Sequence, residues 1–343
     1  GMGSSITSCY IGEIATPELR GPLGATNQLS LTLGVFFVNA AGSHLTVVEQ
    51  GGNHWCQWRN LALWGILGSC ALLTILAMPE SPRWLAQRGD SSAAKAELAR
   101  LRAGDCSAEQ LTLLDLCNGA SPRSYRETKL LDYTPSLVVG IGLLVFQQLS
   151  GANAIMMYAQ SICKSAGVND EAAATDAVML LQVVVTACAC FIMDKFSRRV
   201  LLGFAVILQF CAHLGLSVYY HWSGDLPSWL ALASLAVYIV GFSLAVGPIP
   251  WLIMPEIFPT HVLGRANSLG VAMLWLTSFI VTLTFDSLAD ALGGDGVFLG
   301  FALICLVGLL GIMALVPDTR GKTPEEVCAE LRGDAREPSL RAL

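Results

Sequence analysis

Long apolar segments run through nearly the whole of this 343-residue chain and leave few folds open to it. Hydrophobic residues make up 54% of the sequence and charged residues only 13%, whereas soluble domains carry about 25% charged residues. An apolar helix of about 20 residues is long enough to cross the hydrocarbon layer of a bilayer. The pattern predicts an all-α, polytopic membrane protein with spans at 2–15 (incomplete), 24–42, 58–78, 135–160, 172–193, 199–221, 228–254, 265–290 and 296–316.

The distribution of basic residues predicts how the chain is oriented. Every Lys and Arg except Arg59 and Lys164 falls on one side of the membrane when the polar segment 79–133 is placed in the cytoplasm. Basic residues concentrate in the cytoplasmic loops of membrane proteins. We therefore expect a cytoplasmic C-terminus, in either the plasma membrane or an internal membrane.

An internal duplication divides the chain. Residues 11–24 recur in altered form at 254–267, and each copy is followed by a proline-acidic element, at 79–83 and at 317–320. A hydrophobic chain with an internal duplication on this scale is built from two similar multi-helix halves. We expect the remainder of an N-terminal half at 1–78, a cytoplasmic helical linker at 79–133, a C-terminal half at 134–316 and a cytoplasmic tail at 317–343.

Two adjacent glutamines, Gln147 and Gln148, lie in an otherwise apolar span, and Asn153 follows them closely. Amides in hydrocarbon are costly unless they face a cavity or hydrogen-bonding partners. Between them, Gly151 favours an interruption of the helix. Because an amide both donates and accepts, the segment suits an uncharged ligand rich in hydroxyl groups. The alternative is amide bonding between packed helices.

A second interruption is predicted at the sequence Gly-Pro-Ile-Pro-Trp that begins at Gly247. Pro248 and Pro250 remove two backbone donors, so a regular helix cannot continue through them. Interrupted helices inside a membrane line cavities. Trp251 then offers a flat apolar face with one N–H donor for a sugar ring, or else packs at the kink. Trp275, in the following span, has the same two interpretations.

Charged residues gather at the cytoplasmic ends of the spans. Opposite charges at such positions can latch two halves together and release when the halves move apart. Ordinary anchoring of basic residues in the cytoplasm explains the same pattern, and exposed pairs contribute only about 0–1 kcal/mol each. The acidic members favour the latch. The residues are Glu13, Arg20, Glu80, Arg83, Asp194, Arg198, Arg199, Glu256 and Arg265.

The remaining chemistry-bearing residues form no recognisable site. The 11 cysteines are scattered without the spacing of metal ligands and are interpreted as small apolar residues. His213, within a span, is interpreted as packing between helices and not as carrying protons. No nucleotide motif and no nucleophile–base constellation is found. We therefore expect no enzymatic activity, no cofactor, no metal and no nucleic-acid partner.

Six segments together resemble the sugar porter family of the major facilitator superfamily, which includes facilitative glucose and trehalose transporters. They are YIGEIATPELRG, PESPRWL, QQLSGANAIMMYA, DKFSRR, GPIPWLIMPEIFP and PDTRGKT, in the family's order and spacing over nearly the whole chain. The resemblance implies a major facilitator helical bundle that is incomplete, because members have twelve helices and this chain begins inside the fourth.

The resemblance also implies roles for matching residues. The charged residues at the cytoplasmic ends of the spans match the family's salt-bridge network, although Leu263 stands where an arginine is usual and Leu274 where an asparagine is usual. The two interruptions would be the hinges that close the outer side, at Gly151, and the inner side, at Gly247, Pro248 and Pro250. Sugar contacts are implied at Gln28, Gln147, Gln148, Asn153, Gln182, Trp251 and Trp275.

The function expected from the resemblance is transport of a hexose or disaccharide, similar to glucose or trehalose, by facilitative alternating access. The alternatives are a proton-coupled symporter, a sugar sensor and an inactive truncated fragment. The expected partners are a small-molecule sugar and the lipid bilayer. Neither the identity of the sugar nor the oligomeric state can be inferred from the sequence.

Overall fold

The computed structural model describes residues 2–16, 19–47, 65–66, 68–70, 72–102, 129–165, 171–193, 195–222, 226–320 and 322–333. Helices form the regular structure in these ranges, and no strand occurs in them. The all-α expectation is therefore confirmed. Its physical reason is that a helix bonds its own backbone polar groups and leaves none exposed to hydrocarbon.

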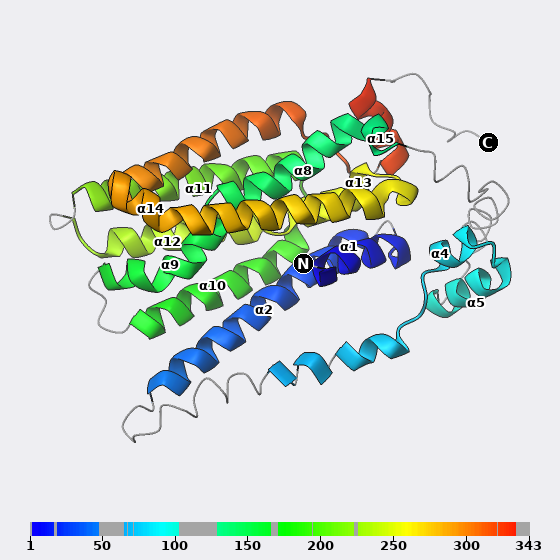
Figure 1. Ribbon diagram of the computed structural model, residues 1–343, viewed down its shortest axis with the longest axis horizontal. Coiled ribbons are helices and arrows are strands. Elements are labelled where there is room, and N and C mark those ends of the chain that lie inside the picture. Colours follow the sequence, from blue (N-terminus) through cyan, green and yellow to red (C-terminus); the bar gives the residue numbers. More distant parts are fainter. Residues whose placement is uncertain are drawn as a thin grey trace.

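The first two helices belong to the N-terminal part of the chain. α1 covers Met2–Ile14 and α2 covers Arg20–Val47, and the two pack against each other. Figure 1 shows α2 running alongside α10 (Glu171–Ile192), which it also contacts. A 3₁₀ helix follows at Leu72–Ala77. The first third of the span predicted at 58–78, residues 58–64, lies outside the described residues.

A small polar unit follows at the end of the bundle. α4 (Pro82–Gln87) begins at Ser81, whose hydroxyl accepts from the Trp84 N–H at 3.3 Å, and α5 (Ser91–Leu101) begins at Asp90. The helices pack together through Ala86, Ala94 and Leu98. Two bonds tie this unit to α1: Arg102 Nη1 donates to the Ile14 carbonyl at 3.1 Å, and the Tyr10 hydroxyl donates to the Pro79 carbonyl at 2.7 Å.

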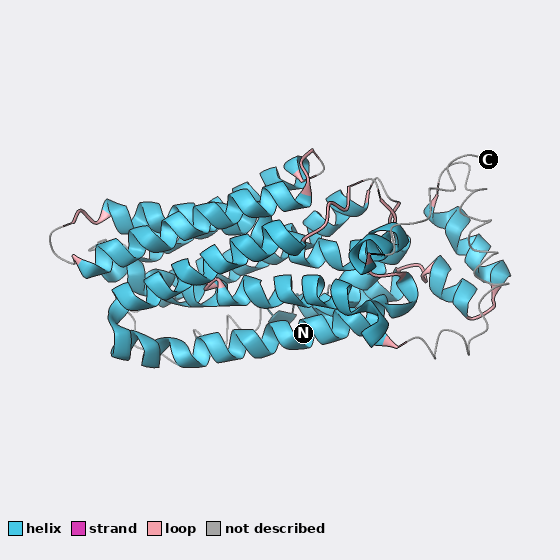
Figure 2. Ribbon diagram, turned by 90° about the horizontal axis from the view of Figure 1, so that it is seen from above, coloured by secondary structure: helices cyan, strands magenta, loops and turns pink. Residues whose placement is uncertain are grey.

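The rest of the molecule is a bundle of long helices that lie side by side along the longest axis (Figures 1 and 2). A 3₁₀ turn at Leu130–Tyr133 leads into it. Besides α10, its elements are α8 (Thr134–Leu149), α9 (Ala152–Ser165), α11 (Arg198–His221), α12 (Trp229–Gly241), a π-helical turn (Phe242–Val246), α13 (Ile249–Ile257) and α14 (Thr260–Leu315). α11 packs against both α12 and α14, and α14 also packs against α8.

α14 contains two of the predicted spans. Its backbone leaves helical geometry at Gly293, where φ is 75° and ψ is 163°. The positive φ favours glycine at this turn. Within the described residues, five helical segments are long and apolar enough to cross a membrane: Leu130–Met156, Ala173–Ile192, Arg198–His221, Trp229–Ile257 and His261–Leu315. The last of these holds both spans that the sequence predicts at 265–290 and 296–316.

The N-terminal helices approach α13 closely because glycines face it. A Cβ atom at Gly24 of α2 would lie 1.9 Å from Leu252 Cδ2, and one at Gly12 of α1 would lie 3.0 Å from Pro255 Cβ. Small residues let membrane helices pack at short distance. α13 is therefore one of the elements through which the two parts of the chain meet, together with α10, which contacts α2, and α14, which contacts α1.

The last described helix, α15 (Pro324–Arg332), lies at the same end of the bundle as α4 and α5 (Figure 1). It begins with a capping box, in which Thr323 and Glu326 each bond the other's backbone N–H. Its buried residues Val327 and Cys328 join the core, and the helix contacts α8 and α13. The tail therefore contains a short helix that is docked on the bundle.

Candidate functional site

The first predicted interruption is present between α8 and α9. α8 ends at Leu149 and α9 begins at Ala152. Gly151, between them, has a φ of 84°, and a Cβ atom there would lie 3.3 Å from the ring of Phe301. Both the backbone angle and the lack of space therefore favour glycine. A bend results in the middle of an otherwise apolar span.

The second predicted interruption lies between α12 and α13, and it is wider than the sequence suggests. After Gly241 the chain makes a π-helical turn that ends with the Gly247 N–H donating to the Phe242 carbonyl at 2.7 Å. Pro250 is the second residue of α13, where a backbone N–H has no helical acceptor. π-Helical turns occur frequently at functional sites.

Gln147 connects these two interruptions. Its Nε2 atom donates to the carbonyls of Val246 at 2.9 Å and Gly247 at 2.8 Å, and its side chain is buried. In a continuous helix the Val246 carbonyl would accept from the N–H of residue 250. Pro250 has no N–H, so the glutamine amide supplies the missing donor.

Gln148 and Asn153 form a second amide contact, which spans the first interruption from α8 to α9. Asn153 Nδ2 donates to Gln148 Oε1 at 2.9 Å and to Ser278 Oγ of α14 at 2.5 Å. The interhelical amide bonding that was an open alternative is thus present. Ser278 was not singled out from the sequence, although its place one turn after Trp275 in an apolar span was an available signal.

Gln28 brings the N-terminal part of the chain to the same place. It is a buried residue of α2, and its Nε2 atom lies 3.4 Å from the position of a Cβ atom on Gly247. Gln182 is buried in α10, and Trp251 is half-buried and packs against the main apolar cluster. Trp275 is 48% exposed on α14. The structure therefore gathers Gln28 and Gln147 at Gly247.

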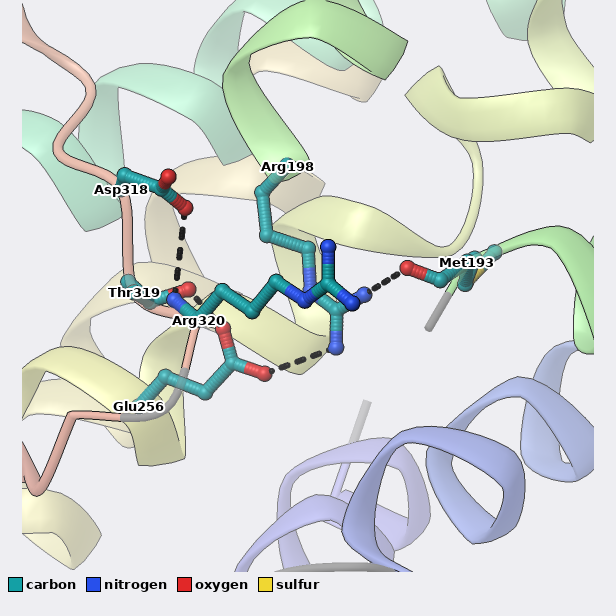
Figure 3. A network of polar contacts seen from close by, with 6 residues as sticks. All are labelled: Met193, Arg198, Glu256, Asp318, Thr319 and Arg320. Carbon is teal, nitrogen blue, oxygen red and sulfur yellow. Dashed lines mark hydrogen bonds and ion pairs between the residues drawn. The ribbon is translucent and has the colours of Figure 1, made fainter. Parts of the chain in front are cut away.

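A network of polar contacts lies where α11 begins and α13 ends (Figure 3). Arg198 Nη2 of α11 lies 3.2 Å from Glu256 Oε1 of α13, and the Thr319 hydroxyl donates to Glu256 Oε2 at 2.7 Å. Arg198 also donates to the Met193 carbonyl. This ion pair joins two helices of the C-terminal half, whereas the sequence suggests a latch between the halves. It therefore braces one half internally.

Arg320 extends this network. Its Nη1 atom donates to the Lys195 carbonyl at 3.1 Å, and its backbone N–H donates to Asp318 Oδ1 at 3.3 Å. Arg320 was not among the predicted gating residues, although its place in the repeated proline-acidic element was an available signal. Among the other predicted gating residues, Glu13, Arg83 and Arg199 are half-buried and Glu80 and Arg265 are exposed, while Asp194 and the side chain of Arg20 lie outside what the structure describes.

A family model described as "Sugar (and other) transporter" matches residues 1–331. The chain belongs to this sugar transporter family. It is 34% identical over 359 residues to the facilitated glucose transporter member 8 of Mus musculus, covering 97% of this chain and 72% of that protein. It is 32% identical over 348 residues to the facilitated trehalose transporter Tret1 of Bombyx mori, covering 98% and 67%. The predicted family is confirmed, and the chain is a multi-pass membrane protein that functions in sugar transport.

The fold matches that of the proton:xylose symporter XylE, a major facilitator superfamily protein. The structure of XylE bound to 6-bromo-6-deoxy-D-glucose gives a TM-score of 0.83 at 26% identity, over 96% of this chain and 71% of that one. The inward-open structure of the same transporter gives a TM-score of 0.68 at 25% identity, over 94% and 68%. The predicted major facilitator fold is confirmed, and the conformation of this chain is more similar to the sugar-analogue complex.

Proposed function

We propose that this protein carries a hexose or disaccharide similar to glucose or trehalose across a membrane by facilitative alternating access. The observation that supports it most is the meeting of Gln28 and Gln147 at Gly247, because it joins both parts of the chain at an interrupted helix. The relatives that transport glucose and trehalose support the class of substrate.

The chemistry of the gathered side chains favours an uncharged ligand. Gln28, Gln147, Gln148 and Asn153 are amides, which donate and accept hydrogen bonds without carrying charge. Sugar hydroxyls also donate and accept, so amides can exchange their bonds to one another for bonds to a sugar. The half-buried Trp251 stands directly after the second interruption and offers an apolar face for the ring.

The two interruptions supply the movement that alternating access requires. Bent helices give way at a few residues, so α9 and α13 can move while α11 and α14 keep their packing. The bracing of Arg198 by Glu256 holds the inner ends of α11 and α13 together. The greater similarity to the XylE complex with a sugar analogue than to its inward-open form supports a conformation that is closed at this end.

The orientation and partners follow from the same proposal. α4, α5 and α15 lie at one end of the bundle (Figure 1). The basic residues that gather in these segments support a cytoplasmic location for that end and for the C-terminus. The lipid bilayer surrounds the helices. Transport of this kind makes and breaks no covalent bond, so the proposal includes no enzymatic step.

A second mode, proton-coupled symport, is supported by the similarity to a proton:xylose symporter. One assay distinguishes the two modes. The protein, expressed from its complete open reading frame and reconstituted in liposomes, is given labelled glucose or trehalose with and without an imposed pH gradient. We expect equilibration of the sugar at the same final level in both cases. Accumulation of the sugar inside the liposomes only when the pH gradient is present would show proton-coupled symport and overturn the facilitative mode.

The matched variants are Gln147→Ala, which removes an amide of the proposed sugar site, and Gln209→Ala, which removes a buried amide of α11 outside that site. We expect the first to lower sugar uptake about tenfold or more, by the loss of hydrogen bonds in a buried site, and the second to transport normally. Absence of uptake of any hexose or disaccharide by well-folded wild-type protein would overturn the proposal.

A further inference from the structure

The carbonyl oxygen of Ser150, at the first interruption, accepts two side-chain hydrogen bonds from neighbouring helices. His213 Nε2 of α11 lies 3.0 Å from it, and the Tyr238 hydroxyl of α12 lies 3.2 Å from it. His213 and Ser150 are fully buried and Tyr238 is 1% exposed. Two scaffold helices therefore hold one main-chain atom of the bend.

The bend creates the need for these donors. In an uninterrupted helix the Ser150 carbonyl would accept from the N–H of residue 154. Here the positive φ of Gly151 turns the chain, and the backbone bonds of α9 begin with the Ile155 N–H donating to the Gly151 carbonyl at 2.9 Å. A buried carbonyl without a donor is costly. His213 and Tyr238 remove that cost only while the bend keeps its present form.

The donors are fixed in place by aromatic packing. The His213 ring centroid lies 5.1 Å from that of Tyr238, 5.4 Å from Phe301 and 6.1 Å from Phe298. Phe301 also fills the space beside Gly151. Because a carbonyl only accepts, His213 must carry its hydrogen on Nε2 to form the bond. This agrees with a packing role for the histidine.

The same residues also reach the second interruption. The Ser150 hydroxyl donates to the Gln147 carbonyl at 2.9 Å, and the Gln147 side chain donates to the carbonyls of Val246 and Gly247. On the other side, Tyr238 stacks on Phe242 with ring centroids 6.3 Å apart and planes within 12°. The two bends are thus joined by a chain of direct contacts.

We propose that His213 and Tyr238 are positioning residues whose hydrogen bonds keep the Ser150 carbonyl in a fixed place while α9 moves about it. We call these three residues the pin. The pin also couples the movement of α9 to the bend between α12 and α13. The role of the movement in sugar passage rests on the proposed function. The pin itself is a property of the fold and is tested without a sugar.

The test uses Tyr238→Phe, His213→Leu and the double variant in the protein from its complete open reading frame. Each single variant leaves the carbonyl one donor, whereas the double variant leaves none. We expect amide hydrogen exchange in α9 (152–165) to rise about 2- to 5-fold in each single variant and by more than the product of the two in the double variant, as expected for an unpartnered buried carbonyl. Exchange in α11 should stay constant.

Transport supplies the second readout. The maximal rate should fall by about the same factors. The sugar concentration for half-maximal rate should change by less than about twofold, because the His213 and Tyr238 side chains bond Ser150 and none of the proposed sugar-binding side chains. His213→Gln keeps a side-chain N–H donor and should recover most of the rate lost in His213→Leu. Gln209→Met is the matched control, since both amide atoms of Gln209 are buried and make no hydrogen bond within the described part of the chain.

Unchanged exchange in α9 for the double variant, or equal rises in α9 and α11, would overturn the pin. If the double variant does not fold, exchange in the single variants decides on the same criterion. A rise in α9 alone, in a protein whose wild type transports no sugar, supports the pin and overturns the proposed function instead.

Discussion

The side-chain amide of Gln147 donates a hydrogen bond of 2.8 Å to the main-chain carbonyl of Gly247. The two residues lie in different interrupted helices, and the contact satisfies backbone atoms that the bend leaves without helical donors. The backbone carbonyls of the second interruption thus account for the presence of a glutamine at position 147 within a membrane span. In the proposed transport cycle, the same amide would bind the sugar once α13 has moved.

Replacing Gln147 with leucine, which has a similar volume and no donor, should destabilise the protein. The carbonyls of Val246 and Gly247 would remain buried without this partner, at a cost of about 1–3 kcal/mol. Thermal unfolding in detergent measures the effect. Gln209→Leu is the control and should not destabilise, because its amide makes no hydrogen bond in the described part of the chain. Equal melting temperatures for the two variants would contradict this reading of Gln147.

Replacing Gly151 with alanine should disturb the first bend. A left-handed backbone costs a residue with a Cβ atom about 1–2 kcal/mol, and the added atom would press on Phe301 at 3.3 Å. We expect lower stability by about that amount and slower sugar uptake. Gly142→Ala, in the same span, has open space around its Cβ position and should be neutral or stabilising. A Gly151→Ala protein as stable as Gly142→Ala would show that the bend is not held at this angle.

The Arg198–Glu256 pair should contribute more than an ordinary surface ion pair. Its side chains are only 11% and 15% exposed, and Glu256 also accepts from Thr319. We expect Arg198→Ala to cost about 1–3 kcal/mol, between the values typical of exposed and buried pairs. A double-mutant cycle with Glu256→Ala isolates the interaction. A coupling energy near zero would mean that the two charges act separately.

Asp90 should make the first turn of α5 sensitive to acid. Its carboxylate accepts from the Ala93 N–H at 3.0 Å and from the Ser92 hydroxyl at 2.9 Å, and these bonds lower the pKa of Asp90 below its ordinary value of 3.8. A carboxyl whose pKa is lowered by folding stabilises the folded form above pH 3.8, and this stabilisation is lost as the pH falls through the lowered pKa.

Hydrogen exchange of the α5 amides, corrected for the intrinsic pH dependence, measures this loss. Protection should be constant above about pH 5 and fall below the ordinary carboxyl pKa. Asp90→Asn keeps a capping oxygen that does not titrate, so its protection should not change with pH in this range. A wild-type profile as flat as that of Asp90→Asn would contradict the assignment.

Much of the fold was predictable because its signals are local. Both helix interruptions were predicted from residues that break a helix by their own chemistry, Gly151 in one case and Pro248 with Pro250 in the other. The family was predictable from motifs in a set order. The π-helical turn at Phe242–Val246 was missed, since those residues read as ordinary apolar helix.

The pairing of side chains was not predictable to the same degree. Glu256 was expected to latch the two halves, but it pairs with Arg198 and Thr319 within one half. Ser278, the partner of Asn153, was not singled out, although it stands one turn after Trp275 in an apolar span. Which residues meet depends on the rotation and spacing of helices, and these are set by packing over the whole interface.

Short segments of the sequence are enough to predict that this chain spans a membrane, belongs to a sugar transporter family and bends where glycine and proline stand, because hydrophobic length and backbone chemistry are local properties. The contacts of Gln147 with the second bend, and of His213 and Tyr238 with the first, arise only in the folded molecule. A buried carbonyl takes whichever donor the packed helices bring within about 3 Å, and that distance exists only after the helices have come together.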